Sequence, residues 1–228
     1  MPIRAITFDL DDTLWAIDPV IARAEELLHA WLGEHWPELA RRFPPAELRA
    51  LRDRLARQRK DLHHDLSALR RLALTHAAQT CGYAPEVADA AFDVLWKARN
   101  EVVLYPDVLP VLERLAGRYA LAGLTNGNAD IALCGVGHVL GFCVSAREVG
   151  VPKPHPQIFA HAVERLGVPP HEVLHVGDDP RSDVGGARQA GMRTVWVNRA
   201  GAPWPGGPQA DIEVNSLSAL ERFLAAHA

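Results

Sequence analysis

The chain has 228 residues, of which 48% are hydrophobic and 23% are charged, and its formal net charge is −4. This balance is typical of a globular protein, and a general nucleic-acid-binding protein would usually carry a basic stripe. No apolar run approaches the ~18 residues of a membrane span, and no signal peptide is recognisable, so we expect a cytoplasmic protein that binds neither nucleic acid nor membranes. Cys81, Cys134 and Cys143 are widely spaced and are expected to be reduced thiols.

Short apolar runs followed by turn residues predict the strands of a parallel sheet. Such runs are typical of strands that are buried on both faces, and they occur at residues 3–9, 119–125, 141–145, 173–177 and 194–198. Helical patterns separate them at roughly 107–117, 155–167, 180–190 and 216–226. This alternation predicts an α/β fold with helices on both faces of the sheet.

Residues 17–103 contain no convincing strand and instead predict four amphipathic helices. The first starts at Asp18-Pro19, with Asp as N-cap and Pro in the first turn. The others follow Pro44-Pro45, carry the apolar positions 66–77, and follow Pro85. Four such helices on short connections indicate a bundle, inserted between the first and second strands. We therefore expect a sheet domain of residues 1–16 and 104–228 and a helical domain of residues 17–103.

Four groups of polar residues follow the predicted strands at their carboxyl ends, which is where open parallel sheets bind ligands. The groups are Asp9 with Asp11, Thr125 with Asn126, Lys153, and Asp178 with Asp183. Each group alone has a plainer interpretation: a solvated turn, a surface lysine, or a helix N-cap pair at Asp178-Asp179. Their combination and order predict that they share one site.

In this order and spacing the sequence resembles the haloacid dehalogenase superfamily. Asp9-Leu10-Asp11-Asp12-Thr13 matches its DxDxT motif, Thr125 and Lys153 match the second and third motifs, and Gly177-Asp178 with Asp183 matches GDxxxxD. The resemblance implies a Rossmann-like core with an inserted helical cap. It also implies a hydrolase that uses Asp9 as nucleophile and forms an aspartyl phosphate.

The same resemblance assigns the other residues of the site. Asp11 is expected to protonate the leaving oxygen and then to deprotonate the attacking water. Mg²⁺ is the expected cofactor, because a dianionic phosphate needs positive charge beside Asp9 and because this ion prefers oxygen ligands. Its expected ligands are Asp9, Asp178 and the backbone carbonyl of Asp11, while Asp183 holds a metal-bound water or orients Lys153.

The phosphoryl oxygens are expected to bind to Lys153, to the Thr125 hydroxyl and to backbone N–H groups near Asn126. Asp11 also decides between two chemistries, because dehalogenases of the superfamily attack carbon and lack both the second aspartate and the metal site. A phosphatase is therefore preferred over a dehalogenase. A sugar phosphomutase, a phosphoglycolate-type phosphatase and a non-catalytic binding module remain alternatives.

The helical insert carries the prediction about substrate. Its position is that of a cap that closes over small phosphate esters, and we expect a monomer or homodimer. The stretches 61–71, 124–130 and 174–187 look like bacterial phosphatases that act on 5-amino-6-(5-phosphoribitylamino)uracil in riboflavin biosynthesis and on FMN. His64 and Arg70 are the cap candidates for substrate contact. The alternative for the histidines is a polar helix start capped by Asp65, and the role of Asp12 is open.

Overall fold

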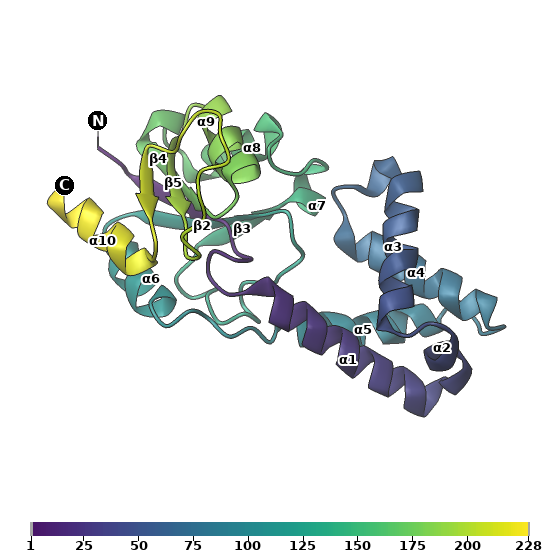
Figure 1. Ribbon diagram of the computed structural model, residues 1–228. Helices are drawn as coiled ribbons and strands as arrows, with labels where there is room; N and C mark the ends of the chain where they lie inside the picture. Colours follow the sequence, from purple (N-terminus) through teal and green to yellow (C-terminus); the bar gives the residue numbers. More distant parts are fainter. Residues whose placement is uncertain (1, 228) are drawn as a thin grey trace. The chain divides into compact units, whose positions relative to one another are not determined.

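The computed structural model describes residues 2–227 and divides the chain into two units, which are treated separately below (Figure 1). The larger unit is formed by the described residues up to Ala16 together with those from Val103 onward. The smaller, helical unit is Ile17–Val102. The larger unit contains the whole sheet, so the chain leaves the sheet after its first strand and returns to it after the helices.

The larger unit is built on a six-stranded parallel sheet with the order β3-β2-β1-β4-β5-β6. The strands are β1 Ala5–Phe8, β2 Ala120–Thr125, β3 Phe142–Ser145, β4 Val173–Gly177, β5 Arg193–Val197 and β6 Ile212–Val214. The first five lie where the apolar runs predict them. β6 is absent from the prediction, because three residues with an exposed Glu213 form no recognisable apolar run. Since all the pairings are parallel, the carboxyl ends of the strands meet at one edge.

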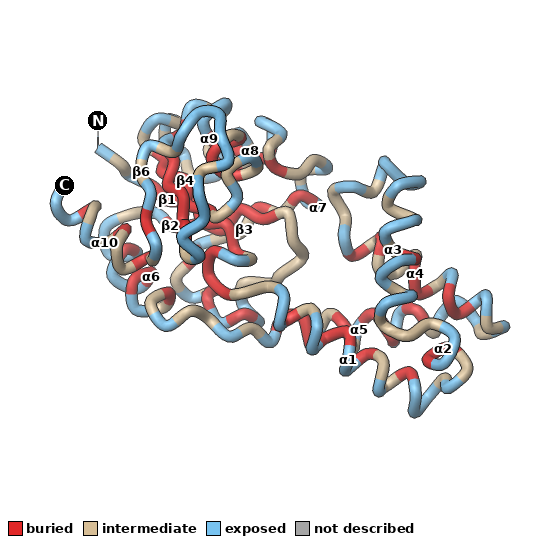
Figure 2. Tube along the Cα trace, viewed as in Figure 1, coloured by how far each residue is buried: buried red, intermediate tan, exposed pale blue. Residues whose placement is uncertain are grey.

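Helices cover both faces of this sheet, which confirms the predicted α/β arrangement. They are α6 Val108–Ala116, α7 Ala146–Val149, α8 Pro156–Leu166, α9 Gly186–Gln189 and α10 Leu217–Ala226. α6 packs against α10 and β2, whereas α8 packs against α9, β2 and β3, and the two pairs lie on opposite sides of the sheet (Figure 1). Pro156 opens α8, and Gly167 closes it in the left-handed conformation with φ 66°. The buried residues concentrate along the strands (Figure 2).

The helical unit contains the four predicted helices and two further short elements. Its elements are α1 Ile17–His35, α2 Pro37–Arg42, α3 Pro45–Gln58, the 3₁₀ turn η1 Lys60–Leu62, α4 Leu66–Thr80 and α5 Val87–Asn100. Leu28, Leu32, Leu74, Phe92 and Leu95 belong to its buried core, which is formed by α1, α2, α4 and α5. These four helices therefore bury most of their apolar residues within the unit itself.

None of the helices that the structure describes is both long and apolar enough to cross a lipid bilayer. The three cysteines are free thiols, as the sequence predicts.

Candidate active site

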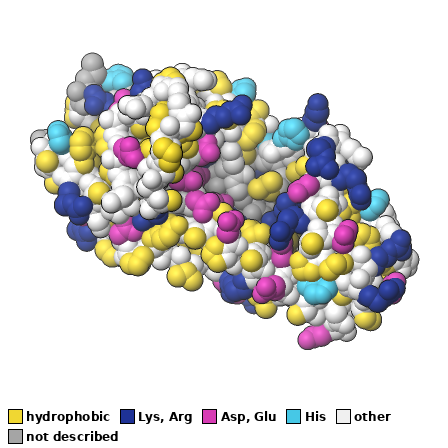
Figure 3. Space-filling model, in the orientation of Figure 1, with side chains coloured by type: hydrophobic (Ala, Val, Ile, Leu, Met, Phe, Trp, Pro, Cys, Tyr) yellow, Lys and Arg dark blue, Asp and Glu magenta, His cyan; other side chains and the backbone are white. Residues whose placement is uncertain are grey.

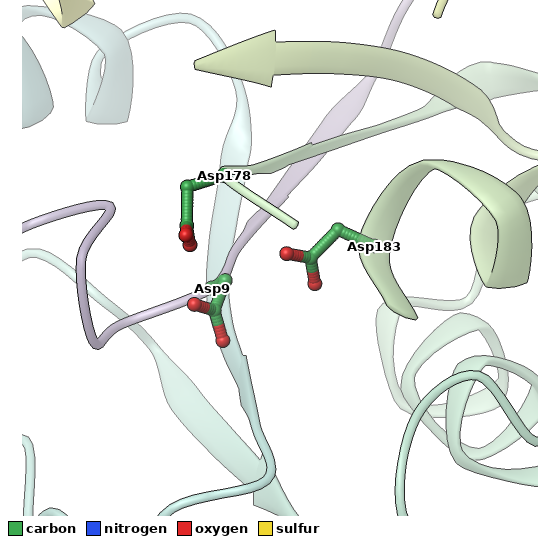
Figure 4. A group of neighbouring side chains, drawn as sticks. All are labelled: Asp9, Asp178 and Asp183. Atoms are coloured by element: carbon green, nitrogen blue, oxygen red, sulfur yellow. The ribbon is translucent and has the colours of Figure 1, made fainter. Parts of the chain in front are cut away.

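Three of the predicted acids meet at the carboxyl edge of the sheet. Asp9 follows β1, Asp178 follows β4, and Asp183 lies in the π-helical turn η3, Pro180–Gly185. Their carboxylates point toward one another (Figure 4), and one oxygen from each lies within 4.8 Å of the other two. Asp9 and Asp183 are buried and Asp178 is partly buried. The topology therefore gathers residues that are more than 160 positions apart in the sequence.

Lys153 joins two of these acids. Its ammonium group is buried and lies 2.5 Å from Asp9 Oδ1 and 2.6 Å from Asp183 Oδ1. Burial opposes a charge on Lys153, but Asp183 and Asp9 outweigh it and raise the pKa of the ammonium group. Burial likewise opposes a charge on Asp183, and there Lys153 prevails and lowers the pKa of the carboxyl group. Lys153 is therefore a cation held by two carboxylates, not a surface lysine.

Asn126 holds the main chain of Lys153 in place. Its amide nitrogen donates to the Lys153 carbonyl at 3.0 Å, and its amide oxygen accepts from the Lys153 N–H at 2.7 Å. The neighbouring Thr125 is buried at the end of β2, and its hydroxyl oxygen accepts the Gly127 N–H at 2.8 Å. Asn126, which follows Thr125 of the second motif, thus fixes Lys153 of the third motif. The sequence alone did not predict this contact.

His175 is a further buried polar residue at this site, and it is absent from the sequence-based candidates. It lies on β4 in register with Thr7 on β1, and its Nδ1 is 2.9 Å from the Thr7 hydroxyl oxygen. Its Nε2 is 3.1 Å from Asp183 Oδ1. Burial lowers the pKa of the imidazole, although Asp183 opposes this. Because a carboxylate only accepts hydrogen bonds, Nε2–H donates to Asp183, and Nδ1 accepts from Thr7.

The Gly177-Asp178-Asp179 segment fits closely around Asp183. A Cβ on Gly177 would lie 2.3 Å from the Asp183 carboxyl carbon, so only glycine leaves room for this side chain. The Asp179 N–H donates to Asp183 Oδ2 at 3.0 Å, and the Asp179 side chain accepts from the Arg181 N–H at 3.0 Å. Asp179 is thus the N-cap of the turn and Asp178 points into the acid group. The interpretation of both residues as a capping pair is therefore wrong.

The carboxylates of Asp9, Asp178 and Asp183 repel one another. Burial, followed by repulsion from Asp183, raises the pKa of Asp178 to about 7, although the Thr13 hydroxyl donates to its Oδ1 at 3.1 Å. Burial also raises the pKa of Asp9 well above its usual range; Lys153 opposes this shift, and Asp183 and Asp178 add to it. A single lysine therefore does not balance the group.

This donor set fits a divalent cation. Carboxylate oxygens are the ligands that Mg²⁺ prefers, and a dication would offset the repulsion that Lys153 leaves. Asp9 and Asp178 are the two expected carboxylate ligands that the structure brings together, and Asp183 is close enough to act with them. The carboxylate of Asp11 is not part of this group, which is consistent with the expectation that Asp11 contributes its backbone carbonyl.

Trp15 positions the segment that carries Asp11 and Asp12. The indole of Trp15 is fully buried, and its Nε1–H donates to Asp11 Oδ1 at 2.9 Å. The Asp12 N–H donates to the Trp15 carbonyl at 2.7 Å, and Asp12 has a φ of 61°. Aspartate tolerates this left-handed conformation better than most residues. Asp12 therefore forms a left-handed turn directly after Asp11.

The predicted cap residues belong to the helical unit. Arg70 lies on α4, and His64 lies just before the start of this helix. Asp65 is the N-cap of α4, and its side chain accepts from the Ala68 N–H at 2.8 Å. This supports the alternative of a polar helix start for the histidines, and contact of His64 or Arg70 with a substrate stays a prediction.

Comparison with known proteins gives the class and the family. Residues 3–191 match the haloacid dehalogenase-like hydrolases. The chain is 32% identical to the 5-amino-6-(5-phospho-D-ribitylamino)uracil phosphatase YigB of Escherichia coli (strain K12), over 97% of this chain and 96% of that protein. It is 37% identical to a phosphoserine phosphatase of Thermus thermophilus, over 65% of this chain and 61% of that one.

Among solved structures, a 2-haloacid dehalogenase from Pseudomonas syringae pv. Tomato DC3000 is similar with a TM-score of 0.93 and 40% identity, over 99% of this chain and 100% of that chain. The fold, the group of acids and these matches make the protein an enzyme of the hydrolase class. More particularly, the chain belongs to the haloacid dehalogenase-like hydrolase family.

Proposed function

We propose that the protein is a Mg²⁺-dependent phosphatase that hydrolyses a small phosphate monoester. The observation that carries this proposal is the convergence of Asp9, Asp178 and Asp183 at one edge of the sheet, with Lys153 between two of them. A nucleophilic attack on carbon needs one carboxylate and no cation. Three crowded carboxylates instead suit a site that takes up a divalent cation together with a dianionic phosphate.

In the proposed first step, the Asp9 carboxylate attacks the phosphorus and the bond from phosphorus to the ester oxygen breaks. Asp11 donates a proton to the departing oxygen. In the second step, Asp11 takes a proton from a water molecule, which attacks the aspartyl phosphate and releases phosphate and free Asp9. The bond from Trp15 fixes the Asp11 carboxylate for both proton transfers.

Lys153 and Thr125 bind the phosphoryl oxygens in this proposal. The Lys153 ammonium uses two of its three protons on Asp9 and Asp183 and can donate the third. The Thr125 hydroxyl oxygen accepts from Gly127 and can donate its own proton. Mg²⁺, held by Asp9, Asp178 and the Asp11 carbonyl with Asp183 nearby, would supply Lewis-acid stabilisation of the phosphoryl charge.

Dehalogenation is the competing activity, because a solved structure so similar to this chain is described as a 2-haloacid dehalogenase. Asp11 favours the phosphatase, since an attack on carbon that expels a halide has no oxygen leaving group to protonate. Asp178 favours it as well, because a second, partly buried acid next to Asp9 would only repel a carboxylate substrate unless a metal cation is present in addition to Lys153.

For the substrate we propose a small phosphorylated metabolite. The similarity to YigB supports 5-amino-6-(5-phospho-D-ribitylamino)uracil, and FMN is the related candidate, which would give the enzyme a place in riboflavin biosynthesis. A phosphoglycolate-type phosphatase and a sugar phosphomutase are the alternatives within the same chemistry. A cytoplasmic location fits these substrates.

The test compares the wild-type protein with Asp9→Asn on p-nitrophenyl phosphate, with Mg²⁺ and with EDTA. We expect turnover that needs Mg²⁺ and that the substitution abolishes; undiminished turnover by the variant would refute the mechanism. Halide release from L-2-chloropropionate, without phosphate release from any ester, would establish the dehalogenase instead. A panel of flavin intermediates, sugar phosphates, phosphoglycolate and nucleotides then ranks the substrates, and a panel without any turnover would favour a binding module.

A further inference from the structure

Arg199, in the loop after β5, links two segments of the larger unit that are far apart in the sequence. Its Nε–H and Nη2–H donate to the Thr13 carbonyl oxygen at 3.3 and 3.2 Å, and its Nη1–H donates to Asp107 Oδ1 at 3.2 Å. Its guanidinium carbon lies 4.0 Å from the centre of the Tyr105 ring. Thr13 belongs to the segment that leaves the sheet after β1, and Tyr105 and Asp107 belong to the segment that returns before α6. Arg199 therefore holds the outgoing and the returning chain together.

The carboxylate that pairs with Arg199 is itself held in place. Asp107 Oδ2 accepts from the Leu217 N–H at 2.6 Å and from the Ser218 N–H at 3.3 Å, at the start of α10. The side chains of Arg199 and Asp107 are only 18% and 15% exposed. A charge-assisted hydrogen bond is roughly twice as strong as a neutral one, and salt screens a partly buried pair less than an exposed pair. The guanidinium is thus anchored on one side and can fix the Thr13 carbonyl on the other.

Thr13 connects this anchor to the group of acids. The residue is fully buried, and its hydroxyl donates to Asp178 Oδ1 at 3.1 Å. Its carbonyl therefore binds Arg199 while its side chain binds one of the acids. On the same segment, Trp15 donates to Asp11 Oδ1. Because both donors belong to one short stretch of main chain, a shift of that stretch would move Asp11 and would take the Thr13 hydroxyl away from Asp178.

Arg199 lies close to the acids but is bonded away from them. Asp and Glu side chains gather in one area of the visible face of the larger unit (Figure 3). Asp12, Asp178 and Arg199 line one cavity of about 440 Å³, which places the arginine beside this acidic edge. Its hydrogen bonds, however, go to the Thr13 carbonyl and to Asp107, so Arg199 bears on Asp178 through Thr13.

We propose that Arg199 is a positioning residue of the hydrolase site. It fixes the main chain of Thr13, so that the Thr13 hydroxyl stays on Asp178 and Asp178 keeps the orientation in which it binds a divalent cation. Residues that orient a metal ligand in this way contribute to metal affinity without touching the metal. The effect on Mg²⁺ rests on the proposed function, whereas the fixation of the segment after β1 does not depend on it.

The first measurement is amide hydrogen exchange of the full-length protein by NMR in EDTA, which requires no activity. The N–H groups of Asp12 and Leu14 donate to carbonyls of the segment after β1 and report on its order. We expect both amides to exchange about tenfold or more faster in Arg199→Met, while amides in the middle of β4 and α8 keep their rates. Arg193→Met removes the same charge from an exposed position at the start of β5 and should exchange like the wild-type protein. Circular dichroism checks folding, and Arg199→Lys, which keeps one donor group, serves if Arg199→Met does not fold.

The second measurement is the affinity for Mg²⁺, determined by calorimetry. We expect Arg199→Met and Thr13→Val each to weaken Mg²⁺ binding by about tenfold or more. The double variant should bind hardly more weakly than Thr13→Val, because both substitutions act through the same hydroxyl and their effects do not add. Arg193→Met should bind Mg²⁺ like the wild-type protein.

Unchanged exchange at Asp12 and Leu14 in Arg199→Met would overturn the proposal, and so would fully additive losses of Mg²⁺ affinity in the double variant. Faster exchange throughout the sheet with unchanged Mg²⁺ affinity would overturn it as well, because Arg199 would then serve the stability of the fold alone. If the wild-type protein neither binds Mg²⁺ nor hydrolyses a phosphate ester, the phosphatase proposal fails, while the exchange rates still decide whether Arg199 fixes the segment.

Discussion

His175 Nε2 and Lys153 Nζ meet at the same atom, Asp183 Oδ1, at 3.1 Å and 2.6 Å. The imidazole donates from the side of β4, and its other nitrogen is fixed by Thr7 on β1. The Phe159 ring also packs against the imidazole in a T-shaped arrangement, with 5.3 Å between ring centroids. Asp183 is therefore held by a buried residue that lies behind it in the sheet, and Asp183 in turn holds Lys153.

Replacing His175 tests whether this support matters for catalysis. His175→Leu leaves Asp183 with one donor fewer, and we expect activity to fall by about 10- to 100-fold, as for other residues that orient a metal-site ligand. The free energy of unfolding should fall by about 1–3 kcal/mol, because the buried carboxylate loses a hydrogen bond. Urea unfolding and steady-state kinetics at several Mg²⁺ concentrations measure the two effects.

His171→Leu changes an exposed histidine just before β4 and is the control. It should leave both activity and stability unchanged. His175→Gln restores a donor and should recover part of the activity. If His175→Leu lowers stability but keeps kcat and the Mg²⁺ requirement of the wild type, His175 serves core packing alone.

Gly177 is predicted to be irreplaceable. In Gly177→Ala the new methyl group would lie 2.3–2.5 Å from atoms of the Asp183 side chain, so either Asp183 or β4 must move. We expect a loss of about 1–3 kcal/mol in stability, as for overpacking elsewhere, and a large loss of activity. Thermal unfolding and initial rates provide the measurement.

Gly33→Ala is the matched control, because a Cβ on this exposed residue of α1 meets nothing within 4 Å. It should raise stability by about 0.5–1 kcal/mol, since alanine is favoured over glycine within a helix. A Gly177→Ala variant as active and as stable as Gly33→Ala would contradict the close contact with Asp183.

Asp12 is expected to matter for its backbone and not for its charge. Asp12→Asn keeps a side chain that tolerates a φ of 61° and should retain most of the activity. Asp12→Val places a β-branched side chain there and should destabilise the protein by about 1–2 kcal/mol. Chemical denaturation and phosphatase assays on both variants distinguish the roles; an inactive but stable Asp12→Asn would indicate a part in catalysis.

The sequence was sufficient to predict the sheet and the acids for a physical reason. Strands buried on both faces must be apolar, and parallel strands deliver the residues after them to one edge, so Asp9, Thr125 and Asp178 follow from local pattern and topology. β6 and α2 could not be predicted, because they are too short to carry a period. Their formation depends on the sheet edge and on the helical core against which they pack.

The supporting contacts of Trp15 and Asn126 were not predicted, although Asn126 itself was a candidate for substrate binding. Asn126 bonds to Lys153, which is 27 positions away, and the bond from Trp15 to Asp11 spans four residues but depends on the conformation of the turn after β1. For His175 a signal did exist: polar residues occupy the third position of two otherwise apolar strands, Thr7 in β1 and His175 in β4. A buried polar pair in adjacent parallel strands predicts a hydrogen bond between them.

Cys143 is expected to make stability depend on pH in the alkaline range. Burial, followed by repulsion from Asp9, raises the pKa of its thiol from 9.0 to about 12. Between these values the unfolded chain has lost the thiol proton and the folded chain has kept it, so a rising pH favours unfolding. At pH 10 the resulting loss in the free energy of unfolding is about 1 kcal/mol.

The measurement compares urea unfolding of the wild-type protein and of Cys143→Ala at pH 7, 8, 9 and 10 in EDTA. The variant has a different stability at pH 7, because a partly buried thiol is lost, but the comparison uses only the slopes. We expect the wild type to lose about 1 kcal/mol more than the variant on reaching pH 10. Parallel slopes would show that the thiol titrates normally in the folded protein.

Asp178→Asn should affect stability in opposite directions with and without Mg²⁺. In EDTA the substitution removes one of three crowded carboxylates while an amide oxygen can still accept from Thr13, so the variant should be as stable as the wild type or more stable. With Mg²⁺ the wild type should gain about 2.7 kcal/mol at 100 times the dissociation constant, because the ion binds only the folded site. The variant should gain far less, because it lacks a ligand, and it should have lost activity.

Asp179→Asn, at the exposed N-cap, should respond to Mg²⁺ like the wild type. A Mg²⁺ response of equal size in Asp178→Asn would place the ion elsewhere, and a loss of stability in EDTA would show that the carboxylate is structural.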